Sequence, residues 1–287
     1  MVASLLGRCR FPNRDVPVAC AFSGGADSTA LVVLARAAGC PVTAIHVDHG
    51  LRESSSTEAE QAAGIADTLG VPFRLMRADI EPGPNLEARA RAARRAALPP
   101  GSLTGHTADD QAETMLINLL RGAGTNGLAG MHCGATKPLL ALRRQETNAL
   151  TAALGIGVVS DPSNTDRRFV RNRVRAEVLP LLDDIAGRDV AALLARTAGI
   201  LADESALLDE LAAMIDPTDA LAVAAADPRL ARRALRTWLL AGGYPPAAAT
   251  IERVLAVAGG GHRSCDLGEG RRLERHRQRL RIVPGRL

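Results

Sequence analysis

Hydrophobic and polar positions follow two periodicities along the first 180 or so residues. A continuous apolar run, typical of a buried strand, covers residues 16–22; the segments 41–47 and 72–79 are also predicted to be strands, and a short strand is predicted to end at Gly105. Apolar residues recur at helical spacing after Asp27 and over about 56–69, 86–98 and 108–121, with a further helix after "KPLLAL". This alternation predicts an α/β fold with a doubly wound, mostly parallel, Rossmann-like sheet. Ligands bind such sheets at the carboxyl ends of the strands.

The pattern changes beyond "AEVLPLLDDIAG". Residues 188–214, 229–240 and 247–258 have the spacing of helices and are rich in alanine and leucine. The last 25 residues have the pattern of short strands around a glycine turn at 268–270. We therefore predict two domains with a boundary near Gly187: an α/β domain over 1–187 and a smaller, mainly helical domain over 188–287 that ends in short strands.

The composition is that of a globular protein. The chain has 287 residues, of which 47% are hydrophobic. No apolar run approaches the roughly 18 to 20 residues of a membrane span, and "MVASLLGRCRFPNRD" is too short and too interrupted by arginine for a signal peptide. The five cysteines are scattered without a CxxC pair, which argues against zinc and disulfides and favours a reducing compartment. We expect a cytoplasmic protein without membrane contact.

A glycine turn joins the first predicted strand to the first predicted helix, in "VPVACAFSGGADSTALVVLARAAG". Ser23, Gly24 and Gly25 have small or absent side chains, so their backbone N–H groups can converge on an anion at the positive end of the helix dipole. A Walker loop requires a lysine that this turn lacks. The turn alone is also compatible with a tight connection in which Asp27 and Ser28 merely favour the first helical turn; we predict a phosphate site.

The stretch "GHTADDQAETMLINLLRG" opens the long helix. Most of it is explained by capping, with Thr107 as the N-cap and Asp109 and Asp110 in the first turn. Capping does not explain His106, which stands just before the cap. From there it can reach the Asp110 side chain and face the crevice beside the glycine turn.

The stretch "HVDHGLR" ends the second predicted strand. Its spacing is compatible with a metal site, but His46 and Asp48 share one face of the strand while His49 lies beyond it. Shaping the crevice beside the first loop is the more ordinary role for these residues.

Arginine is distributed unevenly. The 35 basic and 31 acidic residues leave a net charge of only +4, which does not indicate a general nucleic-acid coat. The helix "LEARARAARR" has the charge pattern of a solvated face. In "DPSNTDRRFVRNRVR" the first residues suit a turn and a helix start, but the five arginines that follow, 167–175, include no acid. Phosphate is the expected partner of such a cluster.

Taken in order, these stretches resemble the tRNA(Ile)-lysidine synthase family of PP-loop ATP pyrophosphatases. The resemblance covers about residues 16–182 and is carried by "SGGADS", "HVDHGLR", "EARARAAR", "GHTADDQAETMLINLLRGAG", "GLAGM", "KPLL" and "DPSNTDRRFVRNRVR". Arg95 stands where the family's E-A-x-A-R-x-x-R-Y pattern has tyrosine, which puts a role for that aromatic in question. The last hundred residues resemble the family's short substrate-binding domain less sharply.

The resemblance implies a two-step reaction. ATP adenylates the C2 oxygen of the wobble cytidine in the isoleucine tRNA with anticodon CAU, and free L-lysine then displaces AMP to give lysidine. Because methionine tRNA shares this anticodon, we expect the region 188–287 to discriminate between the two tRNAs. Oligomeric state is open, and a homodimer is compatible with the family.

The resemblance also implies roles for individual residues. Asp27 would help to bind Mg²⁺, and His106 with Asp110 would supply the base for lysine attack. Arg91 and Arg94 would face developing phosphate charge or tRNA. The remaining implied contacts are with ATP at Ser23, Gly24, Gly25, Ala26, Asp27, Ser28, His46 and Gly105, and with tRNA at Arg171, Asn172, Arg173 and Arg175.

Two other functions share parts of this pattern. A PP-loop tRNA thiolase uses the same loop, but members with cysteine chemistry carry paired cysteines, which this chain lacks. A non-catalytic nucleotide-binding regulator would leave His106, Asp110 and the arginine cluster without a task. A pyrophosphate-release assay separates a regulator from an enzyme.

Overall fold

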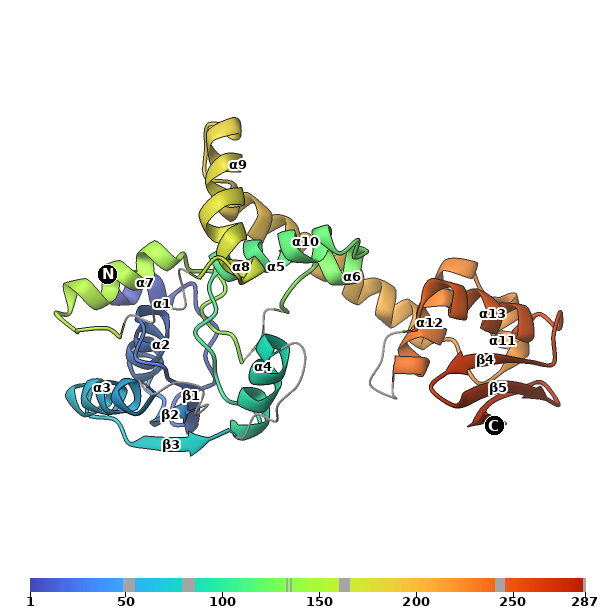
Figure 1. The fold of residues 1–287 in the computed structure, drawn as a ribbon, viewed down its shortest axis with the longest axis horizontal. Coiled ribbons are helices and arrows are strands. Elements are labelled where there is room, and N and C mark those ends of the chain that lie inside the picture. The colour runs from blue at the N-terminus through green and yellow to red at the C-terminus, as the bar shows by residue number, and fades with distance from the viewer. Residues whose placement is uncertain are drawn as a thin grey trace. The chain divides into compact units, whose positions relative to one another are not determined.

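The computed structural model describes residues 1–48, 55–78, 86–132, 134, 136–159, 166–240 and 246–285. The chain forms two compact units, unit 1 over Met1–Ala202 and unit 2 over Asp203–Leu287 (Figure 1). No helix among the described residues is long and apolar enough to cross a membrane.

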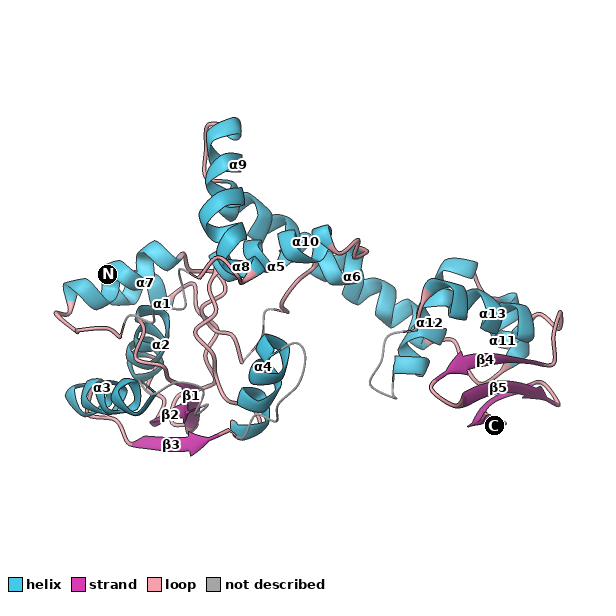
Figure 2. Cartoon of the chain, viewed as in Figure 1, coloured by secondary structure: helices cyan, strands magenta, loops and turns pink. Residues whose placement is uncertain are grey.

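Unit 1 is built on a parallel sheet (Figure 2). Its strands β1 (Val18–Ala21), β2 (Val42–Asp48) and β3 (Phe73–Arg77) lie side by side in that order. Helices α2 (Ala26–Ala37) and α3 (Ser55–Thr68) connect them, as the alternating periodicities predict. The parallel α/β prediction is confirmed, although β1 and β3 are shorter than the segments 16–22 and 72–79 that predict them.

The predicted short strand before Gly105 is reduced to one bridge beside β1. The Leu103 N–H donates to the Ala19 carbonyl at 2.7 Å, and the Ala21 N–H donates to the Leu103 carbonyl at 2.8 Å. These groups of β1 point away from β2. On the β2 side, the Val18 N–H donates to the carbonyl of Pro41, just before β2, and the Phe22 N–H donates to the carbonyl of Ile45. The chain therefore changes sides of β1 after β3, and such a reversal opens a crevice at the carboxyl ends of the neighbouring strands.

The core of unit 1 surrounds α2, whose leucines at helical spacing are buried. Leu31 and Leu34 pack in one cluster with residues of the sheet, of α1 (Val2–Leu6), of α3 and of α7 (Arg144–Ala153). Leu139 and Leu142, from the "KPLLAL" segment, are fully buried in the same cluster.

The remaining helices of unit 1 form a second layer of packing. Ala112 and Leu116 of α5 (Ala108–Leu120) meet Val174, Leu179 and Ala191. These partners belong to a continuous helical stretch and to the helix after it. The elements are α8 (Val170–Arg173), a π-helical turn (Val174–Val178), α9 (Leu179–Ala186) and α10 (Val190–Ala213), whose residues after Ala202 belong to unit 2. Helices α4 (Leu86–Ala97) and α6 (Thr125–Leu128) complete unit 1.

Unit 2 combines helices with an antiparallel sheet. Leu235, Ile251, Leu273 and Leu280 are buried between them. The glycine turn predicted at 268–270 joins the first two strands of that sheet. The elements are α11 (Ala220–Ala225), α12 (Pro228–Leu240), α13 (Ala248–Ala258), β4 (Ser264–Gly268), β5 (Arg271–His276) and β6 (Arg279–Pro284).

The contact between Gly105 and Asp27 leads to a stability prediction. A Cβ atom at Gly105 would lie 2.7 Å from the Asp27 carbonyl oxygen, so Gly105→Ala must displace backbone, at a cost of about 1–3 kcal/mol. Gly64→Ala in α3 is the control, because its Cβ meets nothing within 4 Å and alanine favours a helix by up to about 1 kcal/mol. Denaturant midpoints should fall for the first and rise for the second; equal midpoints would contradict the close approach.

Candidate active site

The turn after β1 presents backbone donors at the start of α2. The Ser23 N–H donates to Ser28 Oγ at 3.2 Å, and the Ser28 hydroxyl donates to the Gly25 carbonyl at 2.9 Å. Gly24 adopts a φ of 76°, and a Cβ atom there would lie 2.7 Å from Val159. Ser23 is exposed, and no described side chain caps the first turn of α2, which begins at Ala26. The helix therefore keeps N–H groups for an anion at the predicted place.

The second edge of the crevice is the start of α5. Thr107 donates to Asp110 Oδ2 through its backbone N–H at 2.8 Å and its hydroxyl at 3.1 Å, so the predicted capping box is present. His106, just before the cap, has Nδ1 2.8 Å from Thr104 Oγ1. It lies close enough to Asp110 for a protonated His106 ring to lower the pKa of that carboxylate. Gly105 places this edge directly against the first turn of α2.

One arginine joins the two edges. Arg144, at the start of α7, lies 3.4 Å from the Asp27 carboxylate, 2.9 Å from that of Asp110 and 3.0 Å from that of Glu113. The Thr147 hydroxyl, one helical turn later, donates to Asp27 as well. Glu113 is completely buried and lies one turn after Asp110 on α5. The guanidinium group therefore ties the glycine turn to α5.

The arginine cluster divides between this network and the surface. Arg171 Nε lies 2.9 Å from one Glu113 oxygen, and Arg175 Nε lies 2.7 Å from the other. Arg173, between them in sequence, pairs with Glu177 at 3.1 Å, and 59% of its side chain is exposed. The cluster predicted to bind phosphate as a whole thus directs two of its arginines to a buried carboxylate.

The two carboxylates nearest the crevice have pKa values shifted in opposite directions. Burial raises the pKa of Asp27, and this outweighs the lowering by Thr147 and Arg144. Burial acts on Asp110 in the same sense, but Arg144, the Thr107 N–H, His106 and Arg171 together lower its pKa. Asp110 is therefore held ionised, whereas Asp27 carries a charge that its surroundings only partly compensate.

Other predicted site residues lie around this centre. His46 is buried at the end of β2, with Nδ1 2.9 Å from the Phe22 carbonyl that precedes the glycine turn. Asn172 donates to the Asp166 carbonyl at 2.9 Å. Arg91 and Arg94 belong to α4, but their side chains lie outside the described part of the chain. The same holds for residues 49–52 of "HVDHGLR" and 161–165 of the arginine stretch.

Three residues of the network are absent from the sequence predictions: Glu113, Arg144 and Thr147. The sequence spacing does contain a signal for Glu113. It follows Asp110 by three residues, so the two carboxylates share a helix face, and Arg171 and Arg175, four residues apart, share a face as well. Arg144 is 117 residues from Asp27, and local spacing carries no information about that contact.

The "GLAGM" stretch is held by α5. The buried Gln111 donates to the carbonyls of Ala129 and Met131, both at 2.9 Å, and accepts from the Met131 N–H at 2.8 Å. Asn118 donates to the Gly127 carbonyl at 2.7 Å. These bonds explain why the motif accompanies the helix that carries Asp110.

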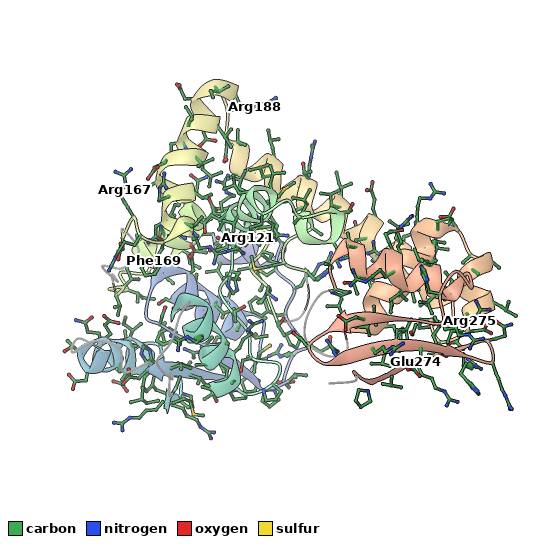
Figure 3. The ribbon with its side chains drawn as sticks, turned by 45° about the vertical axis from the view of Figure 1, so that its right-hand side comes forward. Arg121, Arg167, Phe169, Arg188, Glu274 and Arg275 are labelled. Atoms are coloured by element: carbon green, nitrogen blue, oxygen red, sulfur yellow. The ribbon has the colours of Figure 1, made fainter. Side chains whose placement is uncertain are left out.

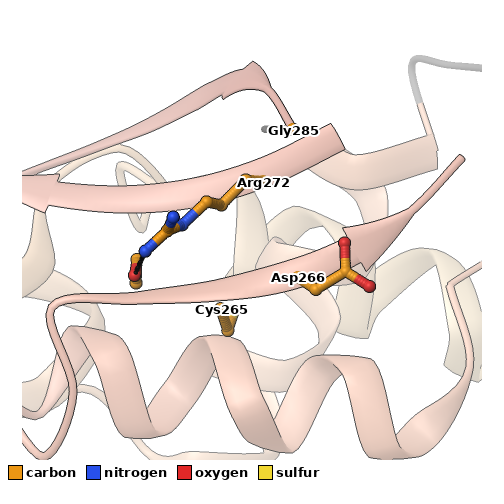
Figure 4. A pocket seen from close by; sticks show the side chains of 5 residues that line it. Cys265, Asp266, Arg272 and Gly285 are labelled. Carbon is orange, nitrogen blue, oxygen red and sulfur yellow. Dashed lines mark hydrogen bonds between the residues drawn. The ribbon is translucent and has the colours of Figure 1, made fainter. Parts of the chain in front are cut away.

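Arg167, Arg168 and Arg173 are exposed, and the sheet of unit 2 is accessible as well. Arg167 and Phe169 lie at the edge of unit 1 (Figure 3). In unit 2 a hollow of about 310 Å³ lies against the sheet (Figure 4), where Arg272 donates to the hydroxyl of Ser264. None of the predicted catalytic residues lines this hollow, which is bordered by Ser264, Cys265, Asp266, Arg272 and Gly285.

Comparison with known proteins gives consistent matches. Residues 6–182 match a family model described as a PP-loop domain, and residues 219–281 match a TilS substrate binding domain. The chain is 44% identical over 250 residues to the tRNA(Ile)-lysidine synthase of Nocardia farcinica, covering 81% of this chain and 78% of that protein. It is 44% identical over 243 residues to that of Mycobacterium tuberculosis, covering 77% and 74%.

A solved structure shares the fold. The U34-tRNA thiolase NcsA from Methanococcus maripaludis superimposes with a TM-score of 0.55 at 19% identity, covering 70% of this chain and 76% of that one. At this identity the likeness concerns the fold alone.

The opposite pKa shifts predict opposite effects on stability. Asp27→Asn removes a charge that is costly above pH of about 4, so it should leave the free energy of unfolding at pH 7 unchanged or raised. Asp110→Asn removes a stabilising charge and should lower it by about 1–2 kcal/mol or more. The Asp110 deficit should shrink as the pH falls below about 4, where the carboxylate of the unfolded chain takes up a proton, and should vanish only below the lowered pKa of the folded carboxylate. Denaturation between pH 3 and 7 measures both, and equal destabilisation would contradict the distinction.

Proposed function

Because the chain belongs to the tRNA(Ile)-lysidine synthase family, we propose that unit 1 ligates free L-lysine to the C2 position of the wobble cytidine in the CAU-anticodon isoleucine tRNA. The supporting observation is that a glycine turn with free helix N–H groups, His106 and a charged network meet at one sheet edge. ATP is the third substrate, beside L-lysine and the tRNA, and the cytoplasm is the compartment.

Adenylation is the first step. The C2 carbonyl oxygen of the cytidine attacks the α-phosphorus of ATP, an O–P bond forms, and the bond to the bridging oxygen breaks. Pyrophosphate leaves with the negative charge that develops on this oxygen. The turn formed by Ser23, Gly24, Gly25, Ala26 and Ser28 binds that charge through the N–H groups at the start of α2, which no described side chain caps.

Asp27 suits a role in binding Mg²⁺. This ion is commonly held by one or two carboxylates and by substrate phosphates, so it needs no dense cluster of protein ligands. Asp27 is half-buried beside the phosphate turn, and its raised pKa reflects a charge that a cation would compensate. When bound there, Mg²⁺ would neutralise phosphate charge. Arg144 and Thr147 hold the carboxylate in place for it.

Transfer of lysine is the second step. The ε-ammonium group has a pKa of about 10.4 in water and must lose a proton before it attacks C2. As the C–N bond forms, the C–O bond to AMP breaks. His106 accepts the proton, because both Asp110 oxygens are occupied by Thr107 and Arg144. Asp110 stays ionised and stabilises the imidazolium.

The tRNA contacts extend over both units. We assign phosphate contacts to Arg173 on the exposed side of its segment, and assign Arg171 and Arg175 to the network that positions the site. Arg91 and Arg94 are further candidates on α4. Unit 2 matches the substrate-binding model, and it is assigned the discrimination between isoleucine and methionine tRNAs, which share an anticodon.

Incorporation of labelled lysine tests this function. With ATP and total tRNA, the wild-type chain should transfer label into RNA and release pyrophosphate. Asp27→Ala should fold but release pyrophosphate at least about 100-fold more slowly, because it loses charge compensation for the leaving group. Asp67→Ala, which removes an exposed carboxylate of α3, should keep activity. Wild-type binding of ATP without release would indicate a regulator instead.

His106→Ala separates the two steps. Adenylated tRNA should still form, while lysine transfer slows by about 10²- to 10⁴-fold, because the amine loses its proton acceptor. His262→Ala, at an exposed position of unit 2, is the control. Single-turnover assays with labelled ATP and labelled lysine resolve the steps, and equal loss of both would place His106 in adenylation.

A further inference from the structure

The segment 166–178 has two faces of different character. Arg171 and Arg175, four residues apart, point to the buried Glu113. Arg167, Arg168 and Arg173 point outward, with 77%, 87% and 59% of their side chains exposed. The outer arginines therefore form a surface patch on an element whose inner face is anchored in the candidate active site.

The outer arginines are only partly compensated. Glu177 pairs with Arg167 at 2.7 Å and with Arg173 at 3.1 Å, so one negative charge balances two positive guanidinium groups. Arg168 pairs with Asp166 at 2.7 Å. Exposed pairs of this kind are weak and screened by salt. A polyanion can therefore replace the carboxylates and release counterions.

An aromatic residue, Phe169, follows Arg167 and Arg168 in this segment, and Figure 3 shows it at the same edge of unit 1 as Arg167. Phe169 is half-buried, and it belongs to none of the three hydrophobic clusters formed by the described residues. Its backbone is held, since its N–H donates to the Asp166 carbonyl and its carbonyl accepts from the Arg173 N–H, both at 3.2 Å. The ring is thus carried by an ordered backbone among exposed arginines.

We propose that Phe169, Arg167, Arg168 and Arg173 form a docking surface for single-stranded RNA, with one base stacked on Phe169 and the adjacent phosphates on the arginines. Given the proposed function, on which this assignment rests, the surface binds the tRNA loop that carries the reacting cytidine. RNA fits better than an acidic polypeptide, because it supplies flat bases as well as charge. Stacking on Phe169 also replaces the base stacking that a neighbouring base loses when the cytidine moves out of the loop.

A double-mutant cycle tests the stacking. Phe169→Leu should weaken binding of a CAU anticodon stem–loop about 10-fold, as loss of one stacked base does, while Phe169→Tyr keeps it. Val170→Ala, at a neighbouring exposed position, is the control. With stem–loops made abasic at each loop position in turn, one position should abolish the difference between wild type and Phe169→Leu. The same loss with every abasic loop would overturn the proposal.

The charges are tested independently of the aromatic ring. Arg168→Ala should reduce the slope of log Kd against log salt by about 0.7, the value for one phosphate contact on a single strand. Arg229→Ala is a matched control, since Arg229 is 85% exposed and pairs with Asp227, two residues earlier, at the same 2.7 Å. Equal slopes for both variants would overturn the phosphate contact. Polyglutamate displacing the RNA equally from wild type and Phe169→Leu would indicate a mere charge patch.

Failure of this inference differs from failure of the proposed function. If the wild-type chain modifies tRNA and Phe169→Leu binds the stem–loop normally, only the stacking proposal is overturned. If the wild-type chain transfers no lysine to tRNA, the proposed function itself is overturned.

Discussion

The arrangement of unit 1 depends on the charge of one buried residue, Glu113. A carboxylate removed from water needs close cationic partners, and losing one of a buried pair commonly costs about 3–5 kcal/mol. Arg144, Arg171 and Arg175 all lie within 3.0 Å of it. They come from the start of α7, from α8 and from the π-helical turn. Satisfying this one charge therefore fixes three segments against α5.

The same requirement sets the chemistry of the crevice. Arg144 extends from Glu113 to both Asp110 and Asp27, so the carboxylates at the two edges share a cation. Their pKa values still shift in opposite directions. Asp110 also accepts a hydrogen bond from the Thr107 N–H at the start of α5, which helps to lower its pKa, whereas the contacts of Asp27 with Thr147 and Arg144 do not offset the effect of burial. A single network thus produces one carboxylate that stays ionised and another that suits a cation, which matches the separate roles proposed for adenylation and lysine transfer.

The arginine-rich segment connects this network with the surface. Helical geometry places Arg171 and Arg175 on one face of the segment and Arg173 on another. The first two therefore contact the buried Glu113, whereas Arg173 is exposed to solvent. A segment anchored from within can present Phe169 and the outer arginines with little loss of conformational freedom on binding. The segment 166–178 thus both stabilises the charged network of the site and carries the proposed RNA-docking surface.

The sequence by itself determined the local features. Its periodicities predicted the parallel strands and most helices, the small residues at 23–25 predicted the turn, and Thr107 and Asp110 predicted the cap, because each depends on residues a few positions apart. Tertiary structure alone decided the rest. It reduced the fourth predicted strand to the bridge at Leu103 and brought Arg144 to Asp27. It also divided the arginines between Glu113 and the surface. These outcomes depend on the order of strands in the sheet and on the paths of the chain between them, which bring together residues far apart in sequence and which no local spacing encodes.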